Sequence, residues 1–119
     1  MIAGMAPQRR PGTFVFCTGA AQVHPAAVAT MREAEGLSQV LPLAEALAAG
    51  FGTGLPMAQI TLTVHSALDG VGLTAAVSAA LADAGVPCNM IAGYHHDHLF
   101  VPEAFADAAL AALHVAAEH

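Results

Sequence analysis

The residues with the clearest chemistry in this 119-residue chain are its histidines, four of which lie within residues 60–102. These four are His65, His95, His96 and His98. Imidazole nitrogens hydrogen-bond small molecules and bind transition metals at neutral pH. The same stretch contains a glycine-rich loop formed by Asp69, Gly70, Val71, Gly72 and Leu73. The stretch therefore predicts a site for a small ligand or a metal ion.

The histidine cluster is compatible with three interpretations. The first is a solvated hairpin tip, in which Asp97 supplies the turn chemistry. The second is the polar wall of a small-molecule site, lined by His65 and His98. The third is a zinc or nickel site, or a small metallo-enzyme, whose candidate ligands are His65 and His98 with either His95 or His96. Asp69 or Asp97 would complete this metal site, although the spacing matches no specific metal motif.

The glycine-rich loop has a chemistry of its own. Gly70 and Gly72 permit positive φ and let the backbone approach a ligand closely. The N–H groups at the start of a following helix would favour a carboxylate or another anion. Asp69 is placed either as the N-cap of that helix or as a carboxylate that meets a ligand amine. We expect this loop to hold the polar end of a ligand.

The hydrophobic pattern indicates which elements position these residues. Alternating apolar and polar residues predict a strand over residues 60–66. An apolar stripe with helical spacing predicts a helix over residues 73–84. A hairpin over residues 88–101 follows, with His96-Asp97 as its turn, and a last helix is expected to bury Phe105.

The N-terminal part of the chain predicts a shorter version of the same order. An irregular lead-in over residues 1–12 precedes a strand over residues 13–18. A hairpin over residues 28–41 follows without a clear helix before it. Pro42 then opens a helix that ends at Gly50, and residues 51–58 form the best linker candidate.

This order of elements predicts an α+β, ferredoxin-like fold, with an antiparallel sheet and helices on one face. A right-handed crossover makes strands 60–66 and 88–95 parallel, with strand 98–101 inserted between them. The glycine-rich loop and the histidines then lie at the same end of the sheet, with His98 near His65.

Composition excludes two classes of partner. The net charge is −6 and no Lys is present, so the basic residues are Arg9, Arg10 and Arg32. Phosphate neutralisation requires clustered basic side chains, so we expect no nucleic-acid partner and no membrane partner. No apolar run predicts a membrane span, and the first residues do not resemble a secretory signal, so we expect a cytoplasmic protein.

Charged residues make up only 10 % of the chain and apolar residues 56 %, so we expect apolar surface to be buried in a homodimer. We expect Cys17 and Cys88 to be small buried residues rather than partners in a disulfide. His24 is expected to be solvated, and Tyr94 to pack against its neighbours.

Three segments of the chain resemble a small stand-alone bacterial group within the ACT-domain family. They are Thr13–Thr18 (TFVFCT), Arg32–Leu37 (REAEGL) and Val64–Pro102, which contains VHS and AGYHHDHLFVP. Within the last segment, Asp69-Gly70-Val71-Gly72-Leu73 is similar to the turn that enters the first helix of ACT domains.

The segments LSQVLPLAEAL and HLFVPEAFADAAL both predict a strand, a proline and an Ala-rich helix. We therefore expect two ACT-like βαββαβ halves, residues 1–57 and 58–119, the first without a full crossover helix. The two halves could also behave as one compact unit. The resemblance implies a non-enzymatic regulatory module that binds a small molecule, usually an amino acid, and it implies no cofactor. Because the fourth strand is not obvious after the last helix, it would come from the N-terminal half or from another subunit. A structural protein without a ligand is a further alternative.

Overall fold

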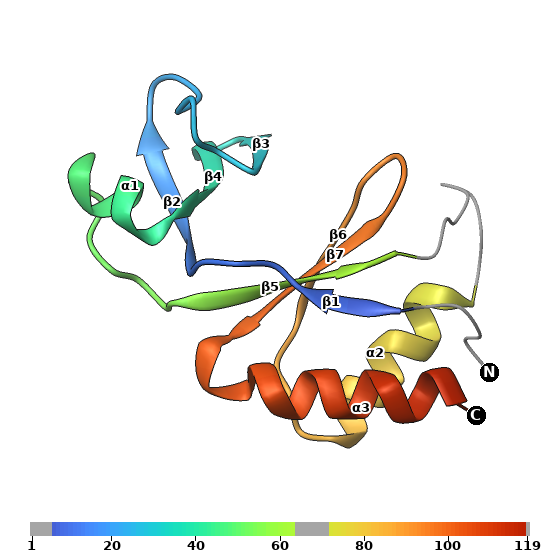
Figure 1. Ribbon diagram of the computed structural model, residues 1–119. Helices are drawn as coiled ribbons and strands as arrows, with labels where there is room; N and C mark the ends of the chain where they lie inside the picture. Colours follow the sequence, from blue (N-terminus) through green and yellow to red (C-terminus); the bar gives the residue numbers. More distant parts are fainter. Residues whose placement is uncertain (1–5, 64–71, 119) are drawn as a thin grey trace. The chain divides into compact units, whose positions relative to one another are not determined.

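The computed structural model describes residues 6–63 and 72–118, which form two compact units (Figure 1). The small unit comprises residues 12–57, and the large unit comprises residues 58–119 together with residues 1–11. Both units combine antiparallel strands with helices, which confirms the predicted α+β, ferredoxin-like class. No helix in these described ranges has both the length and the apolar character needed to cross a membrane.

The strands of the large unit follow the order β1-β5-β7-β6, so β7 lies between β5 and β6 as predicted. The elements of this unit are β1 (Pro7–Arg9), β5 (Met57–Leu62), α2 (Leu73–Asp83), β6 (Asn89–Ala92), β7 (Asp97–Pro102), the 3-10 turn η1 (Glu103–Phe105) and α3 (Ala106–Glu118). The helix predicted over residues 73–84 is therefore confirmed as α2.

Strand β1 lies where a ferredoxin-like sheet has its fourth strand, beside β5 and antiparallel to it. Gln8 pairs with Thr61, and the Arg10 N–H continues the ladder by donating to the Gln59 carbonyl at 2.8 Å. The expectation of an irregular lead-in over residues 1–12 is thus wrong for this strand. The fourth strand comes from the N-terminal part of the same chain.

One face of this sheet packs against α2 and α3, which lie on the same side in Figure 1. The buried residues of the resulting core are Ala58, Ile60, Leu62, Val77, Leu81, Val86, Leu99, Val101, Ala106, Ala109 and Leu113. Successive strand residues point to opposite faces of a sheet. Gln59 and Thr61 therefore lie on the face of β5 that the helices do not cover.

The turn between β6 and β7 differs from the predicted one. Ala92 pairs with Asp97, and the Gly93 N–H donates to the His96 carbonyl at 2.9 Å. The loop therefore consists of residues 93–96, and His96-Asp97 is not the turn. The ladder ends early because the chain already reverses at Gly93.

The burial of Phe105 was also predicted wrongly. Its side chain is 38 % exposed, whereas the next residue, Ala106, is buried in the core. Phe105 ends the 3-10 turn η1, which has about three residues per turn rather than 3.6. This shift in phase moves Phe105 off the apolar face that continues into α3.

The small unit has the strand order β3-β4-β2, with antiparallel pairing between neighbours. Its elements are β2 (Phe14–Ala20), β3 (Ala29–Glu33), β4 (Gly36–Pro42) and α1 (Leu43–Ala48). The predicted hairpin and the helix after Pro42 are both confirmed. One buried apolar cluster of this unit comprises Val15, Cys17, Leu41 and Ala46. Cys17 and Cys88 are both free thiols.

Within the small unit, the connection between β2 and β3 contains no helix, and a buried glutamine anchors it. Gln39 of β4 is only 2 % exposed. Its Oε1 accepts a hydrogen bond from the His24 N–H at 2.7 Å, and its Nε2 donates to the Gln22 carbonyl at 3.4 Å. The side-chain amide thus satisfies backbone groups that a helix would have satisfied internally.

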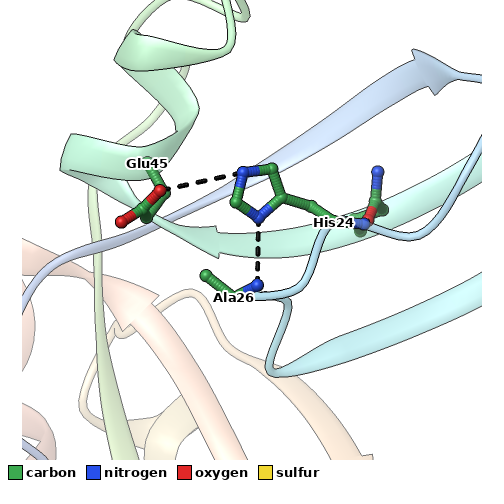
Figure 2. A network of polar contacts seen from close by, with 4 residues as sticks. His24, Ala26 and Glu45 are labelled. Atoms are coloured by element: carbon green, nitrogen blue, oxygen red, sulfur yellow. Dashed lines mark hydrogen bonds and ion pairs between the residues drawn. The ribbon is translucent and has the colours of Figure 1, made fainter.

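His24 strengthens the same connection (Figure 2). Its Nδ1 accepts the Ala26 N–H at 3.0 Å, and its Nε2 lies 3.7 Å from a carboxylate oxygen of Glu45 in α1. The ring is only partly exposed. The expectation that His24 is simply solvated is therefore wrong.

We expect Gln39→Ala to lower the free energy of unfolding by about 1–3 kcal/mol, because it leaves the His24 N–H and the Gln22 carbonyl without their partner. Gln22→Ala is the matched control, since it removes the same side chain from an exposed position and keeps the carbonyl. Urea denaturation would measure both variants. Equal and small losses would contradict the anchoring role of Gln39.

Candidate ligand-binding site

A row of polar side chains crosses the helix-free face of the large unit, and we call it the polar row. Its members are Gln8, Arg10, Gln59, Thr61 and His98. Cross-strand partners in an antiparallel pair point to the same face, which places Gln8 beside Thr61. The ladder bond from Arg10 to Gln59 extends this register, and His98 of β7 contacts Thr61.

His98 is held by two hydrogen bonds at one ring nitrogen. Its Nδ1 lies 3.1 Å from Thr61 Oγ1 and 3.4 Å from Gln59 Nε2. A side-chain NH₂ group can only donate, so Nδ1 acts as the acceptor. The ring proton of the neutral imidazole is then on Nε2, which leaves this N–H available as a donor.

Gly93 makes room for the His98 ring on the side of the hairpin loop. A Cβ atom at residue 93 would lie 3.3 Å from His98 Nε2 and 2.9 Å from the His96 carbonyl oxygen. A side chain at this position would therefore force either the ring or the loop to move. Glycine at position 93 therefore leaves the space beside His98 Nε2.

The surroundings of His98 lower its pKa below the ordinary value for histidine. Burial of the ring is the largest cause, because it disfavours the charged imidazolium. Positive charge on His96 and Arg10 acts in the same direction, and the Asp97 carboxylate opposes it. The neutral form, which the Thr61 and Gln59 contacts also select, is therefore favoured.

Only Gly72 and Leu73 of the predicted glycine-rich loop lie among the described residues. Asp69, Gly70, Val71 and His65 lie outside them, so the predicted proximity of His65 to His98 stays a prediction. Gly72 has a φ of 104° immediately before α2, and no described atom lies within 4 Å of where its Cβ would be. The Leu73 side chain packs against the core, so a ligand contact from this residue would use its backbone.

The described residues do not assemble a metal site. Within residues 6–63 and 72–118, no three His, Cys, Asp or Glu side chains are placed to hold a metal ion together. His95 is exposed, and its ring meets Tyr94 edge-on, with 5.0 Å between the centroids. The metal alternative also involves His65 and Asp69, which lie outside the described residues, so it stays a prediction.

The hairpin loop fits a solvated tip only in part. Tyr94 is 74 % exposed despite its edge-on contact with His95, so the expectation that it is a packed aromatic is wrong. Asp97, by contrast, is only 5 % exposed at the start of β7. The Nδ1 atom of His96 is buried and has no hydrogen-bond partner among the described residues. Solvation therefore describes Tyr94 and His95, but not the residues that follow them.

Sequence reasoning singles out His98 but misses the residues that orient it. Gln59 and Thr61 carry a usable signal, because they alternate with the apolar residues of β5 that face the helices. Arg10 carries none, since β1 has three residues, begins with proline and pairs with a strand about 50 residues away.

Two protein-family models match the chain, and both are described as ACT domains. One matches residues 55–115 and the other matches residues 1–58. The chain is also similar to VC0802 of Vibrio cholerae, a protein of unknown function and possible transport protein. The two are 44 % identical, with a TM-score of 0.87, and the match covers 94 % of this chain and 88 % of the other. No protein with a curated description matches the chain.

More distant solved structures share the fold. Atu0741 of Agrobacterium tumefaciens is 16 % identical with a TM-score of 0.72, and the match covers 93 % of this chain and 87 % of the other. The ligand-free regulatory subunit of aspartate kinase from Thermus thermophilus is 13 % identical with a TM-score of 0.68. That match covers 95 % of this chain and 97 % of the other.

The lowered pKa of His98 predicts a stability that depends on pH. The unfolded chain, with a histidine pKa of about 6.5, takes up the proton before the folded protein does. Folding stability is therefore expected to be highest above about pH 6.5. It should fall as the pH drops from there through the pKa that His98 has in the folded protein. Thermal unfolding between pH 8 and pH 5, a range chosen around roughly 6.5, would measure the effect.

His98→Gln should flatten this loss of stability in acid, because the glutamine does not titrate. His114→Gln, at an exposed position of α3, controls for the removal of an imidazole. An acid loss of the same size in His98→Gln as in the parent protein would show that His98 is not its source.

Proposed function

This chain belongs to the ACT-domain family, and we propose that it is a regulatory module that binds a small metabolite, with an amino acid as the expected ligand. ACT domains are generally regulatory modules that bind small molecules. The regulatory subunit of the Thermus thermophilus aspartate kinase has the same fold, which supports a regulatory role.

The observation that carries the proposal is the way the chain enters α2. Gly72 precedes the helix with a φ of 104°, a backbone conformation that residues other than glycine rarely adopt. The first N–H groups of a helix have no acceptor inside it and attract an anionic group such as a carboxylate. Under this proposal the ligand's polar end is held by Asp69, Gly70, Val71, Gly72 and Leu73.

His98 and His65 would line the wall of the same site. Thr61 and Gln59 orient His98 as a neutral imidazole with its proton on Nε2. Such a group donates a hydrogen bond to a ligand oxygen without bringing a charge into the site. This property suits recognition of a zwitterion, in which the charges are already balanced.

We propose that the module acts without catalysis and without a cofactor. The ACT-domain family is regulatory rather than catalytic. The one hydroxyl known to contact His98, that of Thr61, belongs to a residue only 8 % exposed. A nucleophile must reach its substrate, so this Thr–His pair is better suited to orienting a ring than to attacking a bond.

We also propose that the protein forms a homodimer. Few charges are available to cover its surface, and several large apolar side chains of the small unit are exposed, among them Phe16, Met31 and Leu55. Light scattering over a range of concentrations should give a mass near twice the 12.0 kDa of one chain. The mass of a single chain at every concentration would contradict the dimer.

Thermal shift against the twenty amino acids and a set of divalent metals tests the ligand. An amino acid present at roughly 100 times its Kd should stabilise the fold by about 2.7 kcal/mol. Gly72→Ala should abolish this gain, because a Cβ at positive φ distorts the entry to α2. Isothermal titration would then give the affinity.

Gly85→Ala is the matched control, because Gly85 also has positive φ, with no described atom near its Cβ position, at the other end of α2. Both variants should lose a similar amount of stability, but only Gly72→Ala should lose the ligand response. A shift with zinc or nickel alone would favour the metal alternative. No shift with any compound would favour a structural role.

A further inference from the structure

We infer that the small unit is closed to ligands by its own side chains, so that each chain binds a single metabolite, in the large unit. The expected number of ligands per chain rests on the proposed function, because it assumes that the large unit binds a metabolite. Its structural part, the closure of the segment between β2 and β3, can be tested without any ligand.

The two units follow the same order of strands, which makes their first connections comparable. In the large unit, the connection after β5 leads into α2 at Gly72. In the small unit, the corresponding connection runs from β2 to β3 and contains no helix within the described residues 6–63. The small unit therefore has no helix N-terminus at the position where the large unit has one.

The backbone donors of residues 24–28, the second part of this connection, are already used. The His24 N–H donates to Gln39 Oε1, and the Ala26 N–H donates to His24 Nδ1. The Ala27 N–H donates to the His24 carbonyl, and the Val28 N–H donates to the Val40 carbonyl. Pro25 has no N–H. Every backbone donor from residue 24 to residue 28 thus has a partner inside the small unit, and none is left for an anion.

In the small unit, the Gln39 side chain makes the hydrogen bonds to the backbone of the connection that a ligand would otherwise have to make. Its buried amide accepts a hydrogen bond from the His24 N–H and donates one to the Gln22 carbonyl. Both ends of the amide group are therefore bonded to the connection. A metabolite would have to displace this side chain and find new partners for two backbone groups. Displacing a satisfied, buried amide costs free energy that a small ligand must recover before it gains affinity.

Calorimetry with the amino acid that gives the largest shift in the thermal screen tests the count of ligands. We expect one ligand per chain, and two per chain would overturn the inference. The absence of binding by all twenty amino acids would instead refute the proposed function. The closure itself is then decided by hydrogen exchange on the ligand-free protein.

In that experiment the amides of His24, Ala26 and Ala27 should exchange roughly tenfold or more slowly than unprotected amides, because each is hydrogen-bonded. Gln39→Ala should remove the protection of His24, whereas the control Gln22→Ala should keep it. Unprotected rates at these amides in the parent protein would overturn the inference.

Discussion

The alternation of side chains along β5 is the constraint on which the large unit depends. Ala58, Ile60 and Leu62 are fully buried under the helices, so the residues between them must lie on the other face. Those residues are Gln59 and Thr61, the partners of His98 Nδ1. A slip of one residue in the pairing would turn the apolar residues away from the helices and the polar pair towards them. The core therefore determines which face of β5 meets the His98 ring.

The pairing of β1 with β5 adds a second consequence. A sheet edge with free backbone groups is open to unwanted pairing, and β1 covers part of the edge of β5. The same pairing places Arg10, one of three basic residues in a chain of net charge −6, in the polar row. Its charge disfavours protonation of His98. Residues at the start of the chain thus affect the chemistry of a histidine almost 90 positions later.

Local patterns predicted what local forces determine. The apolar stripe of α2, the β3–β4 hairpin and the helix after Pro42 each depend on residues close in sequence, and all three are confirmed. The errors concern features that tertiary contacts decide. β1 exists through its pairing with β5, and the burial of Phe105 depends on a 3-10 turn that one-dimensional periodicity does not show. His98 was predicted as a site residue, but Thr61 and Gln59, which determine its tautomer, were not.

The two units show opposite solutions to one requirement, that buried or convergent backbone groups must find partners. The small unit meets it internally, since Gln39 and His24 satisfy the connection that replaces a helix. The large unit begins α2 after Gly72, a residue that has no side chain with which to cap the first turn. Stability favours satisfied donors, whereas binding requires donors that a ligand can satisfy. Under the proposed function, a chain that needs both benefits from placing them in different units, so only the large unit is expected to respond to a metabolite.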